Sequence, residues 1–147
     1  MFIEIYENLD HKLRVHNEYV SRIKFIETKQ LVCPLEGKDL DSQQICCISK
    51  KVQNHLVLAG AGTGKTTTII GFVKYILKKG YCEDEDVLIL SFTNASALEM
   101  SKRLKGELEV NVEVQTFHKL GLNIITSVEE KKQTFMQKIF VTMYVFS

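Results

Sequence analysis

The sequence predicts an α/β fold with a parallel sheet, because segments typical of strands and helices alternate along it after a long N-terminal helix. With 147 residues, 45% hydrophobic and 25% charged, the chain has the size and composition of about one globular domain. Its apolar runs are all shorter than the roughly 20 residues that a membrane-spanning helix needs. These observations exclude collagen-like, coiled-coil-only and fully disordered chains, and they predict no membrane partner.

Residues 3 to 30 are expected to form one amphipathic helix. Apolar side chains recur there at steps of mostly three and four residues, and His16 fills the one gap in the series. The series is Ile5, Leu9, Leu13, Tyr19, Ile23 and Ile26. Pro34 and Gly37 then end the helix and begin a linker. We expect the apolar stripe to pack on the rest of the chain, and packing on a partner helix is the alternative.

The next forty residues predict a helix, a strand and a second helix. Asp41 is placed to cap a short helix that runs through Lys50. Residues 55 to 59 form a short apolar stretch that is expected to be the first strand, and a glycine-rich turn follows it. An amphipathic helix is then expected from about Lys65 to Lys79, and Gly80 ends it.

The remaining pattern repeats the alternation of strand and helix. The elements expected are a solvated loop at 83–86, a strand at 87–92 buried on both faces, a helix at 95–105 capped by Asn94, a strand at 112–115, and a helix at 117–125. This order is typical of a parallel sheet with crossover helices. The segment from Lys138 on is apolar and rich in strand formers, and it fits this alternation poorly. A sheet of only three strands would also be unusually small. We therefore expect the fold to be incomplete.

The cysteines and the N-terminus predict a cytoplasmic location. The four cysteines contain no C-x-x-C pair and no histidine at zinc-finger spacing, so we expect free thiols in a reducing compartment; they are Cys33, Cys46, Cys47 and Cys82. The first four residues lack the basic start and apolar stretch of a signal peptide.

A phosphate-binding loop is predicted between the first strand and its helix. The pattern is that of a P-loop (Walker A motif) with alanine in place of the first glycine, and it reads Ala59, Gly60, Ala61, Gly62, Thr63, Gly64, Lys65, Thr66. Small residues let successive backbone N–H groups surround a phosphate, and the helix directs its positive end at the same anion. Lys65 is suited to the β- and γ-phosphates, and the Thr66 hydroxyl to Mg²⁺.

Local charge supports this prediction. The whole chain has a net charge of +1, which predicts no polyanionic or membrane partner by itself. Residues 42 to 82, however, contain six lysines and no acidic residue, so the half that holds the loop is locally positive. ATP with Mg²⁺ is therefore the expected ligand, held by residues 60 to 67 including Thr67. The alternative is a tight turn between strand and helix that binds nothing.

Three segments flanking the loop resemble motifs of the UvrD/Rep-type superfamily 1 DNA helicases, the helicase IV-like group included. Leu40 to Gln44 resembles the Q motif that precedes the loop. Ser91 to Arg103 is similar to motif Ia, and Thr116 to Gly121 is similar to the Thr-Phe-His block. The motifs follow the order of that family over roughly residues 40 to 125. The resemblance implies an incomplete P-loop NTPase (RecA-like) domain and ATP hydrolysis coupled to movement along single-stranded DNA.

The Q-motif resemblance implies that Gln44 contacts the adenine of ATP. A glutamine amide can donate to N7 and accept from N6–H of adenine. The spacing of Asp41 and Gln44 is also that of a capping box, in which Gln44 reaches back to the Asp41 N–H. Both interpretations stay open at the level of the sequence.

The other two motifs imply contacts with single-stranded or duplex DNA. The residues concerned are Phe92, Thr93, Asn94, Thr116, Phe117 and His118. Plain structural roles are the alternatives: Asn94 as a helix cap, the two phenylalanines as core residues, and His118 as a structural hydrogen-bonding group. Ala95 departs from the family pattern, which usually has lysine there, and this removes one candidate phosphate contact.

The family also needs groups that we do not find after Gly121. These are an apolar strand that ends in the Walker B Asp-Glu pair, the transition-state arginines, and a second RecA-like domain. The sequence divides into a helical extension and linker (1–38), a partial ATP-binding domain (39–127), and a tail that begins an insertion (128–147). We expect this chain alone to be inactive and to need the rest of the helicase, and we expect its apolar end to favour self-association. A non-catalytic fragment that binds nucleotide or single strands is the alternative function, followed by a small P-loop kinase.

Overall fold

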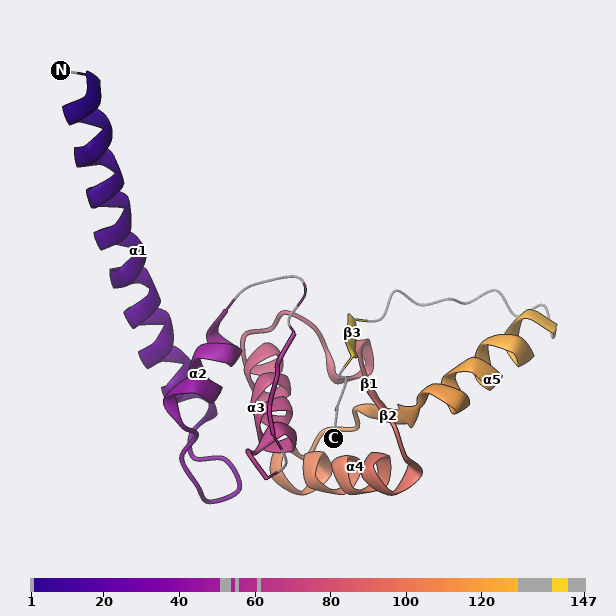
Figure 1. The fold of residues 1–147 in the computed structure, drawn as a ribbon. Helices are drawn as coiled ribbons and strands as arrows, with labels where there is room; N and C mark the ends of the chain where they lie inside the picture. Colours follow the sequence, from indigo (N-terminus) through magenta and orange to yellow (C-terminus); the bar gives the residue numbers. More distant parts are fainter. Residues whose placement is uncertain (1, 51–53, 55, 61, 130–138, 143–147) are drawn as a thin grey trace.

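The computed structural model describes residues 2–50, 54, 56–60, 62–129 and 139–142. Two helices precede the glycine-rich loop, and helices alternate with strands after it (Figure 1). The elements are α1 (Phe2–Val32), α2 (Ser42–Ser49), α3 (Lys65–Lys78), the 3₁₀ turn η1 (Asp84–Asp86), β1 (Val87–Ser91), α4 (Asn94–Leu108), β2 (Glu113–Thr116), α5 (Phe117–Glu129) and β3 (Ile139–Thr142).

The described strands form one parallel sheet in the order β2-β1-β3. β1 is the central strand: Ser91 is paired with Thr116 of β2, and Val87 with Ile139 of β3. Val87, Leu88, Ile89 and Leu90 are all at most 4% exposed, as expected for a strand covered on both faces. The predicted mixed fold, with its parallel sheet and long N-terminal helix, is confirmed.

One predicted strand is wrong. His55 lies outside the described residues, and residues 56–60 form no regular secondary structure. Leu56 and Leu58 are 73% and 81% exposed, although their apolar character suggested a buried strand. β2 and β3 occupy the two sides of β1, so the segment at 56–59 has no strand partner there. Strand pairing depends on distant segments, which the local apolar pattern does not report.

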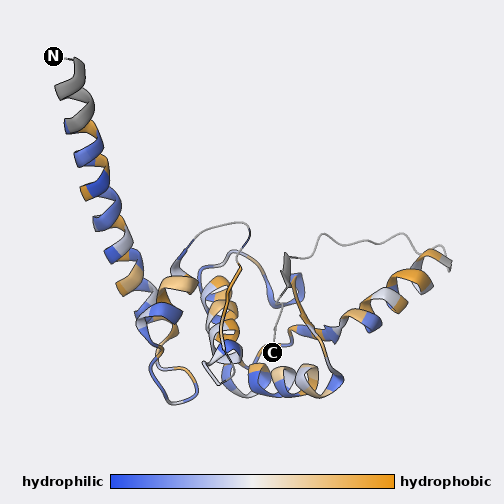
Figure 2. Cartoon of the chain, viewed as in Figure 1, coloured by the Kyte–Doolittle hydropathy of each residue, from blue (hydrophilic) through white to orange (hydrophobic). Residues whose placement is uncertain are grey.

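The hydrophobic core lies around α3. The end of α1, the following loop, α2, β1 and α4 all contribute buried side chains to it, among them Val32, Leu35, Ile45, Ile70, Ile89 and Leu104. Apolar residues are concentrated in α3 and β1, whereas α1 is mixed along its length (Figure 2). A Cβ added to Gly71 of α3 would lie 2.9 Å from Ile48 Cδ1, so this glycine permits the close approach of α2.

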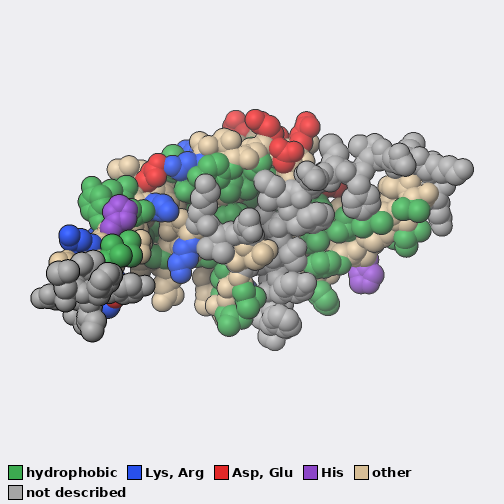
Figure 3. All heavy atoms as spheres, turned by 90° about the horizontal axis from the view of Figure 1, so that it is seen from above, with side chains coloured by type: hydrophobic (Ala, Val, Ile, Leu, Met, Phe, Trp, Pro, Cys, Tyr) green, Lys and Arg blue, Asp and Glu red, His purple; other side chains and the backbone are tan. Residues whose placement is uncertain are grey.

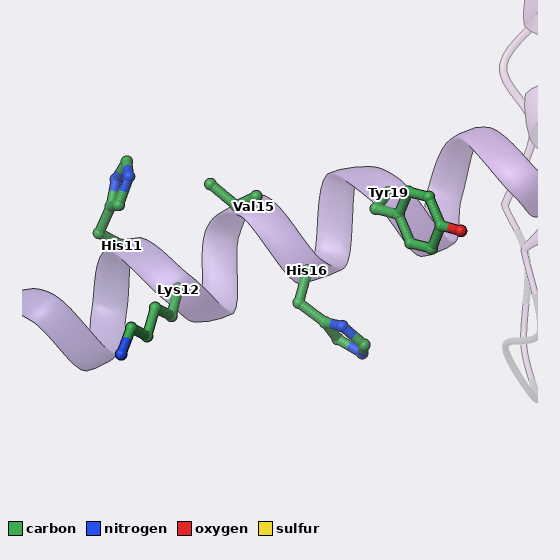
Figure 4. Close-up of a pocket in the computed structure, with 5 residues that line it drawn as sticks. All are labelled: His11, Lys12, Val15, His16 and Tyr19. Atoms are coloured by element: carbon green, nitrogen blue, oxygen red, sulfur yellow. The ribbon is translucent and has the colours of Figure 1, made fainter.

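The helix predicted at residues 3 to 30 forms, but its apolar stripe does not pack on the rest of the chain. Leu9, Leu13 and Tyr19 are at least half exposed, and the helix projects away from the other elements (Figure 1). Among the side chains of α1 from Asn8 on, which the structure describes, only those near its end are buried, at Thr28 and Val32. A hollow on its exposed part is lined by residues of α1 alone (Figure 4). Amphipathic spacing predicted the helix and its apolar face, but it does not report whether another element packs on that face.

Most predicted helix boundaries agree with the structure within a few residues. Asp41 caps α2 as expected, accepting hydrogen bonds from the N–H groups of Gln43 and Gln44. The N-cap of α4 is Thr93 rather than Asn94, which is the first residue of the helix. The Thr93 hydroxyl accepts from the Ser96 N–H at 3.1 Å, and this bond needs Thr93 outside the helix. The expected loop at 83–86 contains the short η1 turn.

In the part of the chain that the structure describes, no helix has the length and apolar character needed to cross a membrane. The four cysteines are free thiols. Burial raises the pKa of the Cys47 and Cys82 thiols above the ordinary value, which lowers the fraction of reactive thiolate at neutral pH.

Candidate functional site

The glycine-rich segment forms a tight loop at the start of α3. Gly62 and Gly64 have φ angles of +75° and +80°, which side-chain-bearing residues rarely adopt. The Thr63 hydroxyl donates to the Gly60 carbonyl at 2.8 Å, and this bond closes the turn. Ala61 lies outside the described residues. The two glycines thus serve the backbone geometry that the motif requires.

Lys65 folds back over this loop. Its ammonium group donates to the carbonyl oxygens of Ala59 at 3.0 Å and Gly60 at 3.2 Å. These acceptors are neutral, and no carboxylate holds the ammonium in the hydrogen bonds formed with described residues. The positive charge therefore stays available to an anion at the loop.

The first turn of α3 directs backbone N–H groups at the glycine-rich loop. Gly64 is its N-cap and has no side chain to accept from the N–H groups of residues 65 to 67. The helix's first backbone bond runs from the Thr68 N–H to the Gly64 carbonyl, at 2.9 Å. The positive end of the helix dipole adds to these donors, so the turn is suited to an anion.

Three consecutive threonines in this turn have different partners. The Thr67 hydroxyl accepts from Arg103 at 2.9 Å, and the Thr68 hydroxyl donates to the Gly64 carbonyl at 3.0 Å. The Thr66 hydroxyl forms no hydrogen bond with the residues that the structure describes. Thr66 thus has the one hydroxyl of the three that is left for a ligand, and a hydroxyl oxygen is a suitable donor to Mg²⁺.

Gln44 lies beside the loop although it is twenty residues away in sequence. Its Oε1 accepts from the Asp41 N–H at 2.9 Å, so the capping box is formed. Its Nε2 lies so close to Gly64 that a Cβ added there would be 2.6 Å away. The cap and the position at the loop are compatible, because the cap uses the amide oxygen and leaves the amide nitrogen at the loop.

Arg103 of α4 forms an ion pair that the sequence reasoning did not predict. Its guanidinium donates to both carboxylate oxygens of Glu36, one of them at 2.6 Å, and to the Thr67 hydroxyl. The bond to Arg103 holds the pKa of the Glu36 carboxyl below its usual range, and the bond to Glu36 raises the pKa of Arg103. Both groups are charged at neutral pH. Arg103 belongs to the motif Ia stretch, which was the one available signal, whereas nothing in the sequence near Glu36 indicates this pairing.

The residues predicted to meet DNA come together at one edge of the sheet. Ser91 and Thr116 are paired across β1 and β2, so the segments that follow them leave the sheet side by side. Phe92 is 84% exposed and Phe117 is 39% exposed, and Asn94 and His118 are also exposed. The core alternative for Phe92 is therefore wrong. Exposed apolar side chains continue along α5, at Leu122, Ile125 and Val128 (Figure 3).

Two threonines of this edge have structural roles. Thr93 caps α4, and its hydroxyl also contacts the Ser96 hydroxyl at 2.8 Å. Thr116 is 6% exposed, and its hydroxyl accepts from the Lys119 N–H at the start of α5. The structure thus brings the six residues to one edge, where Thr116 is buried and the other five are exposed.

Comparison with known proteins identifies the family. The model of the UvrD/REP helicase N-terminal domain matches residues 40–143. DNA helicase IV of Escherichia coli K12 is 30% identical over 117 residues, which are 79% of this chain and 17% of that protein. The ATP-dependent DNA helicase Rep of Buchnera aphidicola subsp. Baizongia pistaciae is 42% identical over 76 residues, 49% of this chain and 11% of that protein.

DNA helicase II of Escherichia coli K12 is 32% identical over 89 residues, 58% of this chain and 12% of that protein. The chain therefore spans less than a fifth of the length of these relatives. Residues 40–143, which the family model matches, include the glycine-rich loop and all three flanking motifs. The chain belongs to the UvrD/Rep helicase family, and it corresponds to the N-terminal part of such a helicase.

Proposed function

We propose that this chain is the ATP-binding part of an ATP-dependent DNA helicase, with an incomplete P-loop NTPase fold of the RecA-like type. The observation that carries the proposal is the first turn of α3. There Lys65, and Thr66 with a hydroxyl that has no hydrogen-bond partner among the described residues, directly follow a loop with two left-handed glycines. The relatives' names include ATP-dependent DNA helicases, which supports ATP as the nucleotide. Membership of this family argues against a small P-loop kinase.

In this proposal the loop residues 60–64 surround the phosphates with backbone N–H groups. Lys65 leaves the carbonyls of Ala59 and Gly60 and binds the β- and γ-phosphates, because a phosphate is a stronger acceptor for an ammonium than a neutral carbonyl. Thr66 holds Mg²⁺ through its hydroxyl, and the ion neutralises charge on the same phosphates. Gln44 presents its amide group to the adenine: Nε2 donates to N7, and Oε1, which can accept a second hydrogen bond besides the one from the Asp41 N–H, accepts from N6–H.

The DNA-binding part of the proposal rests on the edge formed by β1 and β2. Bases stack on exposed aromatic rings, and Phe92 and Phe117 offer such rings directly after the ends of the neighbouring strands β1 and β2. Asn94 and His118 supply exposed polar groups beside them. Movement along DNA is a property that we propose for the whole helicase, in which this chain supplies one of the parts.

Binding and turnover should separate in this chain. The described residues offer groups that bind phosphate, whereas Glu129 ends a helix rather than a strand and is no candidate for Walker B. We expect calorimetry to give one site for Mg·ATP, and a phosphate-release assay to give only slow background hydrolysis with or without oligo(dT). Absence of nucleotide binding would contradict the proposed function. DNA-stimulated hydrolysis at several turnovers per second would contradict the proposed need for further residues.

Phe92→Ala is expected to weaken single-stranded DNA binding. Stacking of one base on an aromatic side chain contributes about 1–3 kcal/mol, so the affinity for oligo(dT) should fall by roughly 5- to 150-fold. Fluorescence anisotropy with labelled oligo(dT) measures this. Leu98→Ala is the matched control, because Leu98 is also an exposed apolar residue near the start of α4, at 58%. Equal losses for both variants would show that Phe92 acts only as exposed apolar surface.

A further inference from the structure

The loop between α1 and α2 contacts both α3, which holds the candidate ATP site, and α4. Leu35 and Lys38 are joined by two backbone hydrogen bonds, and between them Glu36 has a φ of +51°. The Glu36 N–H donates to a Glu107 carboxylate oxygen of α4 at 3.0 Å. The Glu36 side chain is thereby fixed at its backbone before it meets Arg103.

Arg103 connects this loop with the first turn of α3. One guanidinium nitrogen donates both to Glu36 and to the Thr67 hydroxyl, and a second nitrogen donates to the other Glu36 oxygen at 2.6 Å. The side chains of Arg103 and Glu36 are only 27% and 29% exposed, so solvent screens this pair less than a surface ion pair. The bidentate geometry fixes the direction in which the remaining N–H points.

We propose that Glu36 and Arg103 are positioning residues for nucleotide binding, which hold Thr67 and thus the phosphate-binding turn of α3 in place. Thr67 directly follows Thr66 and Lys65, so a displacement of Thr67 also moves the two groups assigned to Mg²⁺ and phosphate. This inference rests on the proposed function. In this inference the loop between α1 and α2, which includes Glu36, contributes to the geometry of the ATP site.

A second ion pair in the same contact provides an internal control. Lys74 donates to Glu107 at 3.1 Å and to the Pro34 carbonyl at 3.0 Å, so it also ties α3 to α4 and to the loop. Lys74 lies seven residues beyond Thr67, about 10 Å further along the helix at 1.5 Å per residue. If the loop only stabilises the fold, both pairs should matter alike. If it positions the site, only the pair at Thr67 should affect nucleotide binding.

The experiment compares Arg103→Met, Glu36→Gln, Thr67→Val and, as the control at the second ion pair, Lys74→Met in the full chain. Calorimetry gives the dissociation constant for Mg·ADP, and thermal unfolding of each variant shows whether it is folded. We expect the first three changes to weaken binding by about three- to tenfold, a coupling typical of residues in direct contact. Lys74→Met should bind like the wild type, because it breaks the Lys74–Glu107 pair but keeps the bond from the Glu36 N–H to Glu107. Arg103→Lys should give an intermediate affinity, because lysine keeps the charge but not the bidentate geometry.

The double variant Arg103→Met/Thr67→Val should bind no more weakly than either single variant, because both changes break one contact. Additive losses would overturn the inference, since they would mean that Thr67 contacts the nucleotide independently. Wild-type affinity in the folded Arg103 and Thr67 variants, or an equal loss in Lys74→Met, would also overturn it. If Arg103→Met does not fold, Thr67→Val alone decides. Wild-type protein that binds no Mg·ADP would instead contradict the proposed function.

Discussion

Lys65→Ala should remove most of the Mg·ATP affinity of this chain. The ammonium group of Lys65 lies over the loop, and a hydrogen bond to a charged group contributes about 1.5–3 kcal/mol. The dissociation constant should therefore rise by roughly 10- to 150-fold, as measured by calorimetry. The alanine variant also frees the carbonyls of Ala59 and Gly60, which repel the phosphates.

Lys78→Ala is the matched control for this variant. It removes the same charge from the last turn of the same helix, at an exposed position. Lys78 lies thirteen residues from Lys65, about 20 Å along α3 at 1.5 Å per residue, so it should have little effect in 0.15 M salt. Equal losses in both variants would mean that general positive charge, and not Lys65, binds the nucleotide.

Gly64→Ala should be the most damaging change that adds only one carbon atom. Gly64 has a φ of +80°, a conformation that costs a side-chain-bearing residue about 1–2 kcal/mol. The new Cβ would also lie 2.6 Å from Gln44 Nε2, and the capping bond to Asp41 restrains that amide. The loop and Gln44 must then move apart. We expect nucleotide binding to fall at least tenfold and the preference for ATP over GTP to disappear, since a lost bidentate base contact removes roughly 1–3 kcal/mol of discrimination.

Gly106→Ala controls for the exchange of glycine for alanine itself. A Cβ at this position of α4 meets nothing within 4 Å. Alanine is favoured over glycine inside a helix by roughly 1 kcal/mol, so this variant should be as stable as the wild type or more stable, with unchanged nucleotide affinity. Wild-type nucleotide binding by Gly64→Ala would show that the left-handed turn and the contact with Gln44 are not needed.

The sequence predicted local features well, because neighbouring residues determine them. Asp41 and Gln44 form the expected capping box, and the continuous apolar run of β1 is buried as expected. The α3 helix begins at Lys65, where the P-loop pattern places it. The family resemblance, drawn from the order of four short motifs, is confirmed by the family model.

Features that depend on distant segments were missed. The exposed stripe of α1 and the unpaired residues 56–59 have ordinary amphipathic or strand-like patterns, and only the arrangement of the other elements leaves them uncovered. The bond between Glu36 and Arg103 joins residues 67 positions apart, and no local pattern reports such a pair. In the candidate site, the loop was therefore predictable, whereas the contacts that fix its helix were not.

The most direct test of the ATP site follows backbone amide signals of the ¹⁵N-labelled chain by NMR during titration with Mg·ADP. We expect the largest shifts at Gly62 to Thr67, with a smaller shift of the Gln44 side-chain amide, and we expect all of these to be lost in Lys65→Ala. Saturable shifts confined to other elements, such as the exposed face of α1, with unchanged signals from Gly62 to Thr67, would contradict the proposed ATP site.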